Sequence, residues 1–301
     1  MQWQTLDSTP PLLPLYWRAA LKRKITGSSL PECGLRCRMS INPSAVAAYR
    51  KVCGFADSPM LPATYPHILA FGLQLQLLTD KSFPFPLLGL IHLRNRIRIH
   101  RPLGGVGDVS VGVYARNLSP HPKGATFDIV TVVEDALGLL WEGESQMLCR
   151  GVKVEGEAAD SGSQTPGTLT ELTRWKAPPD IGRRYARVSG DYNPIHLSTP
   201  TAKLFGFPQA IAHGLWNKAR TLAALAEHLP AANIEIDVAF MKPVRLPSEV
   251  ILMSSAAGSS GAGGVAQGPL LGSEDRSLGD PAAQLARPHP APAVLAFVQR
   301  N

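Results

Sequence analysis

Cysteine is scarce in this sequence, and its spacing excludes two classes of site. The 301 residues contain four cysteines, Cys33, Cys37, Cys53 and Cys149. Cys33 and Cys37 have a C-x-x-x-C spacing, but no second pair follows at a metal-ligand spacing, which argues against a zinc site. Four thiols in a chain of this length also argue against a disulfide framework and favour a reducing compartment. We therefore expect neither a metal ion nor structural disulfides.

Long hydrophobic runs are also missing. The apolar stretches fall far short of the ~20 residues that a membrane span needs. The first 24 residues lack a basic n-region, and prolines interrupt their apolar run, so they do not resemble a signal peptide. These absences predict a soluble cytoplasmic protein with no membrane partner.

No long basic block occurs, although the chain is basic overall. Its net charge is +7, its pI is about 9.4, and its 30 Lys and Arg residues are scattered. Without a basic stripe interleaved with aromatic residues, nucleic acid is not a favoured partner. A small substrate that carries phosphate is a more favoured partner for this positive charge. Most of the Lys and Arg side chains are expected simply to be solvated.

What the sequence does contain is an internal repeat. Residues 49–54 read YRKVCG and residues 185–190 read YARVSG, while residues 101–109 (RPLGGVGDV) are matched by residues 242–250 (KPVRLPSEV). The matches keep their order, at offsets of 136 and 141 residues. Two such matches flanking one apolar segment in each half indicate a duplication.

The apolar segments between these motifs predict one helix in each half. They span residues 66–78 and 210–229, lengths that suit a buried or half-buried helix better than a strand. In the first half, strand-like stretches follow at residues 90–100, 108–114, 126–134 and 139–149. We expect an antiparallel meander that wraps its helix in order to bury the apolar face of both.

Composition sets the expected domain boundaries. Residues 155–167 lack apolar periodicity and are interpreted as a linker between an N-terminal domain, 1–154, and a second domain, 168–255. Residues 256–301 are rich in Gly, Ala, Ser and Pro and are predicted to be largely disordered.

The second half has fewer strand-like stretches than the first. Residues 234–241 and 249–254 are plausible strands, and beyond residue 256 only residues 293–299 have strand-like composition. Because the first half supplies four such stretches, the second half does not complete its meander, and the second sheet is expected to be incomplete. A reading-frame change or a truncation near Ser254 would produce such a tail.

Residues 189–196, SGDYNPIH, carry the chemistry. Gly, Asp, Asn and Pro so close together predict a tight loop, and Pro194 biases Asn193 towards an extended conformation. Such a loop can aim Asp191 and His196 at one point, where a carboxylate and an imidazole hold water and move protons at neutral pH. The alternative is that Asp191 caps a turn and His196 makes a structural hydrogen bond.

A second motif, Ala212-His213-Gly214-Leu215, opens the apolar helix of the second half. A glycine there leaves a backbone N–H open to close approach, where the helix dipole favours developing negative charge. Read together with Asp191 and His196, Gly214 is interpreted as an oxyanion residue rather than only a packing glycine. For His213 a packed core role is favoured over a functional one.

The pattern SGDxNPxH followed by GF and IAHG, within residues 185–214, resembles the signature of the MaoC-like dehydratases and (R)-specific enoyl-CoA hydratases (hydratase 2). The close match covers about thirty residues. The resemblance implies an α+β, tandem (double) hot-dog fold, in which each half has a long central helix wrapped by a curved antiparallel sheet. It also implies interconversion of trans-2-enoyl and (R)-3-hydroxyacyl thioesters, enoyl-CoA being the favoured substrate.

The resemblance assigns residue roles as well. It places the catalytic pair on Asp191 and His196, the oxyanion residue on Gly214 and a loop-organising residue on Asn193. It implies no cofactor, because the coenzyme A or carrier-protein pantetheine is part of the substrate. A homodimer beyond the internal pseudo-dimer is left open.

The first half lacks this catalytic loop. Phe55 stands where Asp191 stands, no NPxH follows, and 13 residues separate Gly54 from His67 where 23 separate Gly190 from His213. This half resembles the inactive half of a double hot-dog hydratase, which either makes room for the acyl chain or only completes the pseudo-dimer. The following side chains line a tunnel or form core: Leu69, Phe71, Leu73, Leu75 and Leu77.

Two other functions compete with the hydratase. The first is a catalytically impaired protein that binds acyl-CoA or acyl carrier protein, favoured by the unusual tail and opposed by the intact pair of Asp191 and His196. The second is a thioesterase on the same fold, which is less favoured because SGDxNPxH resembles hydratases. Acyl chain length, the choice of carrier and the physiological direction are not encoded in any motif found.

Overall fold

The computed structural model describes residues 1–156, 169–255, 265–269, 282–283 and 295–300. The chain divides into two compact units, Met1–Val46 with Pro59–Ser161, and Ala47–Ser58 with Gly162–Asn301. The second unit thus includes a short segment from the N-terminal half of the chain, which the sequence did not indicate. Within the described residues, none of the helices has both the length and the apolar character that a membrane crossing requires.

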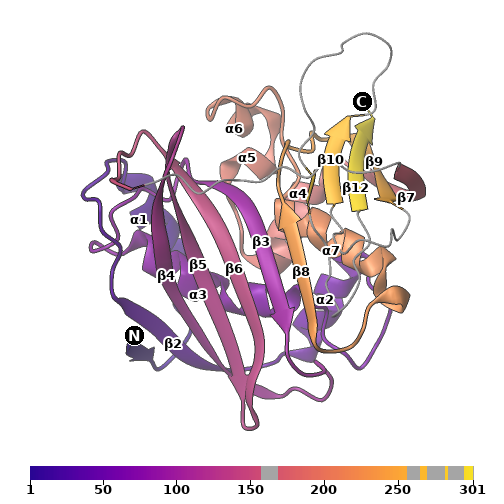
Figure 1. Cartoon of the computed structure of the whole chain (residues 1–301), viewed down its shortest axis with the longest axis horizontal. Coiled ribbons are helices and arrows are strands. Elements are labelled where there is room, and N and C mark those ends of the chain that lie inside the picture. The colour runs from indigo at the N-terminus through magenta and orange to yellow at the C-terminus, as the bar shows by residue number, and fades with distance from the viewer. Residues whose placement is uncertain (157–168, 256–264, 270–281, 284–294, 301) are drawn as a thin grey trace. The chain divides into compact units, whose positions relative to one another are not determined.

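A six-stranded sheet dominates the first unit. Its strands lie in the order β1-β2-β4-β5-β6-β3 and are antiparallel except for β1 and β2 (Figure 1). The strands are β1 (Gln2–Leu6), β2 (Cys33–Ser40), β3 (Ile91–Ile99), β4 (Asp108–His121), β5 (Gly124–Asp135) and β6 (Gly138–Arg150). The four strands predicted from residues 90–149 are confirmed. In β5 the residues Ala125–Thr131 are all buried, so this strand is covered on both faces.

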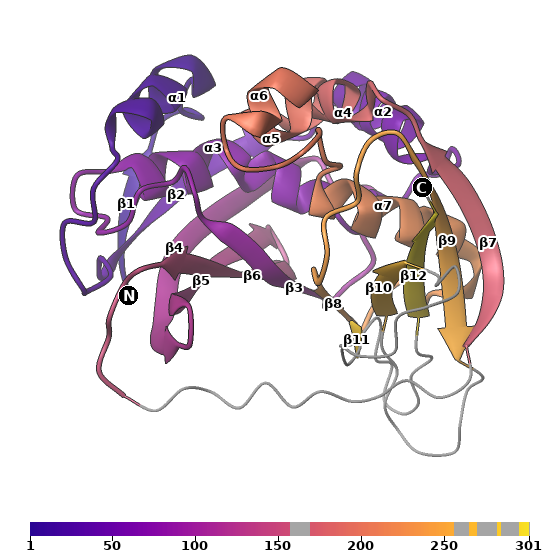
Figure 2. The same ribbon diagram turned by 90° about the horizontal axis from the view of Figure 1, so that it is seen from above.

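Helix α3 (Tyr65–Thr79) is the central helix of this unit and confirms the prediction for residues 66–78. It packs against β2, β4 and β5 on one side and against α1 (Leu12–Leu21) on another (Figure 2). Because neighbours flank it on several sides, its apolar residues are not confined to one stripe. Of the five side chains singled out, Leu73, Leu75 and Leu77 are buried, while Leu69 and Phe71 are half-buried.

The second unit is also a helix against a sheet, with β7 and β9 beside α7 (Figure 2). Its helices are the C-terminal part of α2 (Pro43–Cys53), α4 (Ile181–Ser189), α5 (Pro194–Leu197), α6 (Thr199–Lys203), α7 (Gly214–Ala224) and the 3-10 turn Ala226–His228. Its strands are β7 (Leu169–Ala177), β8 (Ile234–Ala239), β9 (Ser248–Ser255), β10 (Val265–Pro269), β11 (Ala282–Ala283) and β12 (Leu295–Arg300). Both units thus have the α+β, central-helix arrangement expected of a tandem hot-dog fold.

The second sheet has more strands than the sequence predicted. Its order is β11-β10-β12-β9-β7, so three strands from beyond residue 256 complete it. β12 pairs antiparallel with β9, from Leu295 opposite Ser254 to Arg300 opposite Glu249. The expected shortage of strands is therefore wrong, since composition alone did not reveal β10 and β11. The rest of 256–301 lies outside the described residues, and its predicted disorder stays a prediction.

Helix α7 is shorter than the predicted helix of residues 210–229. The residues before it are extended, because the Ala212 N–H donates to the Val244 carbonyl (2.8 Å) and the Leu246 N–H donates to the Ala210 carbonyl (2.9 Å). Inside the unit, the buried Lys218 side chain donates from Nζ to the Ile236 carbonyl of β8 at 3.2 Å. Hydrogen bonds to the backbone therefore hold both the segment before α7 and the helix itself.

The repeat has a structural counterpart in both of its motifs. α2 and α4 each end at a glycine with positive φ, +75° at Gly54 and +79° at Gly190, which only glycine adopts easily. In the first unit the Leu61 N–H donates to the Leu103 carbonyl at 2.9 Å, the same contact that Ala212 makes with Val244 in the second. Leu61 therefore corresponds to Ala212, and Pro62 to His213.

This register corrects the sequence comparison, which set His67 against His213. His67 is the third residue of α3, whereas His213 immediately precedes α7. The comparison from the sequence was misleading because the second copy has extra residues between Gly190 and Ala212. Counting from the glycine to the next histidine therefore does not pair equivalent positions.

Side chains of α7 cap the end of α2 within the second unit. Trp216 donates from Nε1 to the Val52 carbonyl at 3.1 Å, and Arg220 donates from Nη1 to the Cys53 carbonyl at 3.3 Å. The Arg220 guanidinium also lies 5.2 Å from the ring of Trp175 in β7. The last carbonyls of a helix have no partner within it, so these donors replace water there.

Replacing Arg220 by Met should therefore destabilise the second unit. Loss of a charged donor to a buried helix end and of the cation–π contact should lower the free energy of unfolding by about 2 kcal/mol. Urea titration followed by circular dichroism measures it. Arg187→Met, at an exposed arginine of α4, is the matched control. Equal midpoints for the two variants would contradict the capping role.

Candidate active site

The loop between α4 and α5 holds Asp191 through its own backbone and side chains. The Asp191 N–H donates to Ser189 Oγ at 3.1 Å, and Asp191 Oδ1 accepts from the Asn193 N–H at 3.2 Å. Asn193 Oδ1 in turn accepts from the Ile195 N–H at 3.4 Å and caps α5. Asp191 remains about one-third exposed, so its free carboxylate oxygen can meet solvent or ligand.

His196 lies on helix α5 and not in an open loop, which corrects the expectation for residues 189–196. Asn193 and Pro194 begin this helix, because proline suits the first helical position. α4 packs closely behind it, since a Cβ at Gly182 would overlap the His196 carbonyl oxygen. The close approach of the Gly182 backbone therefore fixes the position of His196.

The hydrogen bond of His196 fixes its tautomer. The side chain is 8% exposed, and Nδ1 lies 2.8 Å from the Ile211 carbonyl oxygen. A carbonyl only accepts, so Nδ1 carries the proton and Nε2 keeps a lone pair. Burial lowers the pKa of His196, while Asp191 and the Ile211 carbonyl partly oppose this shift. At neutral pH His196 is thus a neutral imidazole with a free acceptor nitrogen.

His213 stacks directly on His196. The ring centroids are 3.7 Å apart with an interplanar angle of 27°, and His213 is 2% exposed. His213 Nε2 donates to the Asp191 carbonyl at 3.0 Å, and the Tyr185 ring lies 4.8 Å away on the other side. His213 therefore contacts both predicted catalytic residues, which the favoured core interpretation did not anticipate. Nothing in its spacing from Asp191 signalled this contact.

The stacked pair can hold no more than one positive charge in its buried setting. Burial, followed by the nearby charge of His196, lowers the pKa of His213 well below its usual range, and the hydrogen bond to the Asp191 carbonyl only partly opposes this. His213 Nε2 is also 3.7 Å from Asp191 Oδ2. His213 consequently stays neutral when His196 takes up a proton.

The geometry of the three side chains suits water better than a metal ion. One ligand atom from each of Asp191, His196 and His213 lies within 4.8 Å of the other two, close enough to surround a cation. However, an ion bound by two imidazoles must lie near the plane of each ring, and nearly parallel rings one stacking distance apart share no such point. One nitrogen of each ring is also committed to a backbone carbonyl.

Gly214 is the first residue of α7, and its N–H has no partner among the residues that the structure describes. It lies at the positive end of an 11-residue helix, where an anion is favoured. A Cβ at Gly214 would come within 2.9 Å of the Phe240 ring, so packing also requires glycine here. The packing interpretation is therefore supported, and the oxyanion role stays a prediction with which the open N–H is compatible.

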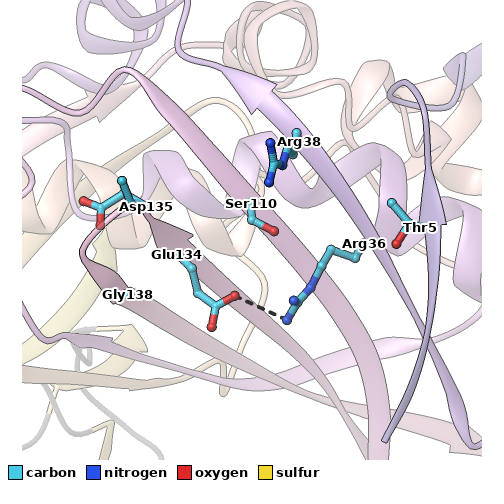
Figure 3. A pocket seen from close by; sticks show the side chains of 8 residues that line it. Thr5, Arg36, Arg38, Ser110, Glu134, Asp135 and Gly138 are labelled. Atoms are coloured by element: carbon cyan, nitrogen blue, oxygen red, sulfur yellow. Dashed lines mark ion pairs between the residues drawn. The ribbon is translucent and has the colours of Figure 1, made fainter.

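A separate pocket of about 540 Å³ lies in the first unit (Figure 3). Its charges are mostly paired: Arg36 with Glu134 at 3.3 Å, and Asp135 with Arg101. None of the predicted site residues lines it. The catalytic candidates therefore remain Asp191, His196, His213 and Gly214.

Comparison with known proteins agrees with the family resemblance seen in the sequence. The model of the family described as MaoC like domain matches residues 160–262. The 3-hydroxyacyl-thioester dehydratase X of Mycobacterium tuberculosis is 37% identical over 211 residues, which are 70% of this chain and 75% of that protein. The peroxisomal enoyl-CoA hydratase 2 of Arabidopsis thaliana is 27% identical over 50% of this chain and 54% of its own length.

Solved structures agree on the fold. The crystal structure of HtdX of Mycobacterium tuberculosis has a TM-score of 0.63 at 34% identity and covers 76% of this chain and 90% of its own. A MaoC-like dehydratase from Phytophthora capsici also has a TM-score of 0.63, at 22% identity, over 78% of this chain and 88% of its own.

The buried imidazole pair should make stability depend on pH. Both pKa values are lowered on folding, so below about pH 6.5 the unfolded chain binds more protons than the folded protein. The free energy of unfolding therefore decreases as the pH is lowered. His213→Phe keeps a ring but removes one titrating group, and should flatten this slope by up to about 1.4 kcal/mol per pH unit.

Urea titrations between about pH 5 and 7 measure the slope. His228→Phe, at an exposed histidine, is the control and should keep the parent slope. An unchanged slope for His213→Phe would mean that His213 takes up its proton as readily in the folded protein as in the unfolded chain.

Proposed function

Because the chain belongs to the MaoC-like dehydratase family, we propose that it interconverts trans-2-enoyl thioesters and (R)-3-hydroxyacyl thioesters, with Asp191 and His196 activating one water. The chain is a hydro-lyase, and the finer points of the proposal are its stereochemistry and its catalytic pair. The observation that carries them is the neutral His196 imidazole, whose tautomer is fixed, beside the partly exposed Asp191 carboxylate.

The water step follows from these two groups. A water held between the Asp191 carboxylate and His196 Nε2 gives a proton to Nε2 while its oxygen bonds to Cβ of the enoyl thioester. The dyad then returns a proton to Cα on the same face, so that one water is added across the double bond. Because the two groups share one water, they titrate as a coupled pair.

Gly214 is proposed to stabilise the charge that develops on the thioester oxygen. As water adds to Cβ, the carbonyl becomes enolate-like and its oxygen gains negative charge. The open N–H at the start of α7 is a fixed donor with the helix dipole behind it. Removing one such donor typically costs 10²- to 10³-fold in rate, so this contribution is substantial.

His213 serves this scheme as a neutral support. Its Nε2–H holds the Asp191 backbone, and its ring lies against His196 without competing for the proton. We assign it a positioning role. The reaction transfers no electrons and requires no cofactor beyond the pantetheine-bearing carrier that the substrate itself contains.

Two substitutions test the dyad. Asp191→Asn and His196→Ala should each reduce kcat for hydration of crotonyl-CoA by about 10³-fold, because each removes half of the proton relay. Loss of enone absorbance measures the rate. Asp180→Asn and His228→Ala are matched controls away from the loop and should retain activity. A parent protein that binds enoyl-CoA without turnover would instead support the acyl-CoA-binding alternative.

Product configuration tests the stereochemistry separately. Hydration of trans-crotonyl-CoA should yield a single enantiomer, since the dyad delivers hydroxyl from one face, and the resemblance to the (R)-specific hydratases predicts the (R)-3-hydroxybutyryl thioester. Chiral chromatography of the hydrolysed product distinguishes the two enantiomers. Formation of the (S) product, or of a racemate, would refute the proposed arrangement of water and substrate even if activity were high.

A further inference from the structure

The outer face of α1 carries a line of exposed apolar side chains. Leu13 is 71% exposed, Trp17 67% and Leu21 80%. They lie four residues apart, so they follow one face of the helix. The opposite face is buried through Leu15 and Ala19, where α1 packs on α3. α1 is thus apolar on both faces, and packing within its own unit accounts for only one of them.

The segment that carries this stripe has charge of one sign, although Asp80 from the turn after α3 lies near Lys22 and Arg18. Residues 8–31 contain no Asp or Glu but four cations, Arg18, Lys22, Arg23 and Lys24. Lys22 is used internally, since its Nζ donates to the carbonyls of Asp80 at 2.6 Å and Phe83 at 2.5 Å and ties the end of α1 to the turn after α3. The other three are exposed beside the stripe.

The size and shape of the stripe argue against a second copy of the chain. A stable protein interface needs about 800 Å² and 20–30 residues from each partner. Three side chains supply roughly 400 Å² of apolar surface. They also project from a convex helix, and a rigid partner would need a matching groove. A deformable lipid headgroup layer needs none.

Leu and Trp on one face flanked by Lys and Arg is the composition of helices that lie in a membrane interface. We propose that α1 docks on the surface of an anionic phospholipid bilayer, with Leu13, Trp17 and Leu21 entering the headgroup region and Arg18, Arg23 and Lys24 facing lipid phosphates. This departs from the expectation of no membrane partner, which rested on the absence of spans. It does not depend on the proposed hydratase function.

Vesicle flotation tests the proposal. The parent protein should bind vesicles of phosphatidylcholine with about 30% phosphatidylglycerol and bind pure phosphatidylcholine at least tenfold more weakly. The triple variant Leu13→Ser, Trp17→Ser, Leu21→Ser should lose at least tenfold in partition coefficient. Leu137→Ser and Leu204→Ser, each at a leucine 82% exposed outside α1, are matched controls and should bind like the parent.

Charge is tested by Arg23→Glu with Lys24→Glu, which should weaken binding to anionic vesicles at least tenfold. Hydration of soluble crotonyl-CoA should be unchanged in all these variants, so a failed dyad and a failed membrane site are distinguishable. If the triple variant does not fold, as judged by circular dichroism, Trp17→Ser alone should show a smaller loss.

Three results would overturn the proposal. The first is a parent protein that does not float with anionic vesicles. The second is equal binding by the triple variant and the two leucine controls. The third is a parent dimer in light scattering that the triple variant converts to monomer, which would show that a second copy covers the stripe.

Discussion

The stacking of two buried imidazoles, His196 on His213, is the contact on which the rest of the site depends. Their separation of 3.7 Å forbids two charges, because neither ring has solvent to spread a second one. His213 must therefore stay neutral when His196 is protonated, which agrees with the proposed role of His196 as the residue that exchanges a proton. His196 Nδ1 and His213 Nε2 are each held by a backbone carbonyl, whereas His213 Nδ1 is buried without a hydrogen-bond partner in the described residues. The Asp191 carboxylate lies near both rings and can balance one positive charge.

Two tyrosine rings extend this stack of imidazoles. Tyr185 lies 4.8 Å from His213, and Tyr49 lies 6.1 Å from Tyr185, so four rings form a column within the second unit. Tyr49 and Tyr185 are the equivalent tyrosines of the duplicated motif. Residues 47–58 belong to the second unit and bring Tyr49 to this column, which gives a physical reason for retaining the first copy of the motif although it lacks the catalytic loop.

The sequence predicted what local pattern controls. Strand-like stretches separated by turn residues identified β3 to β6, and an apolar run beginning at Pro66 identified α3 almost to the residue. It predicted the start of α7 less well, because residues 210–212 are held extended by Val244 and Leu246, more than thirty residues away. β10 and β11 were missed for a similar reason, since Gly- and Ala-rich segments become strands only through the neighbours that pair with them.

The site shows the same division. The motif SGDxNPxH identified Asp191, Asn193 and His196 because all three lie on one short stretch whose turns the sequence encodes. His213 is packed in the core as expected, but its stacking on His196, 17 residues away in the sequence, was not predicted, because a single sequence contains no sign of which ring a histidine will meet. Gly214 was found only because it begins a helix.

The duplicated register explains why only one half can carry this chemistry. From the glycine that ends the helix to the shared backbone contact, the second copy uses 22 residues (Gly190 to Ala212) and the first uses 7 (Gly54 to Leu61). The fifteen extra residues make room for α5 and α6, and so for His196.

The remaining positions in the first copy are equally unsuited. Pro62 takes the place of His213 and provides neither a ring nitrogen nor an N–H. Ala63 takes the place of Gly214, but α3 begins only at Tyr65, so Ala63 is not the first residue of a helix. No single substitution in the first copy would restore a site, because the insertion, the histidine and the open helix start are all missing together.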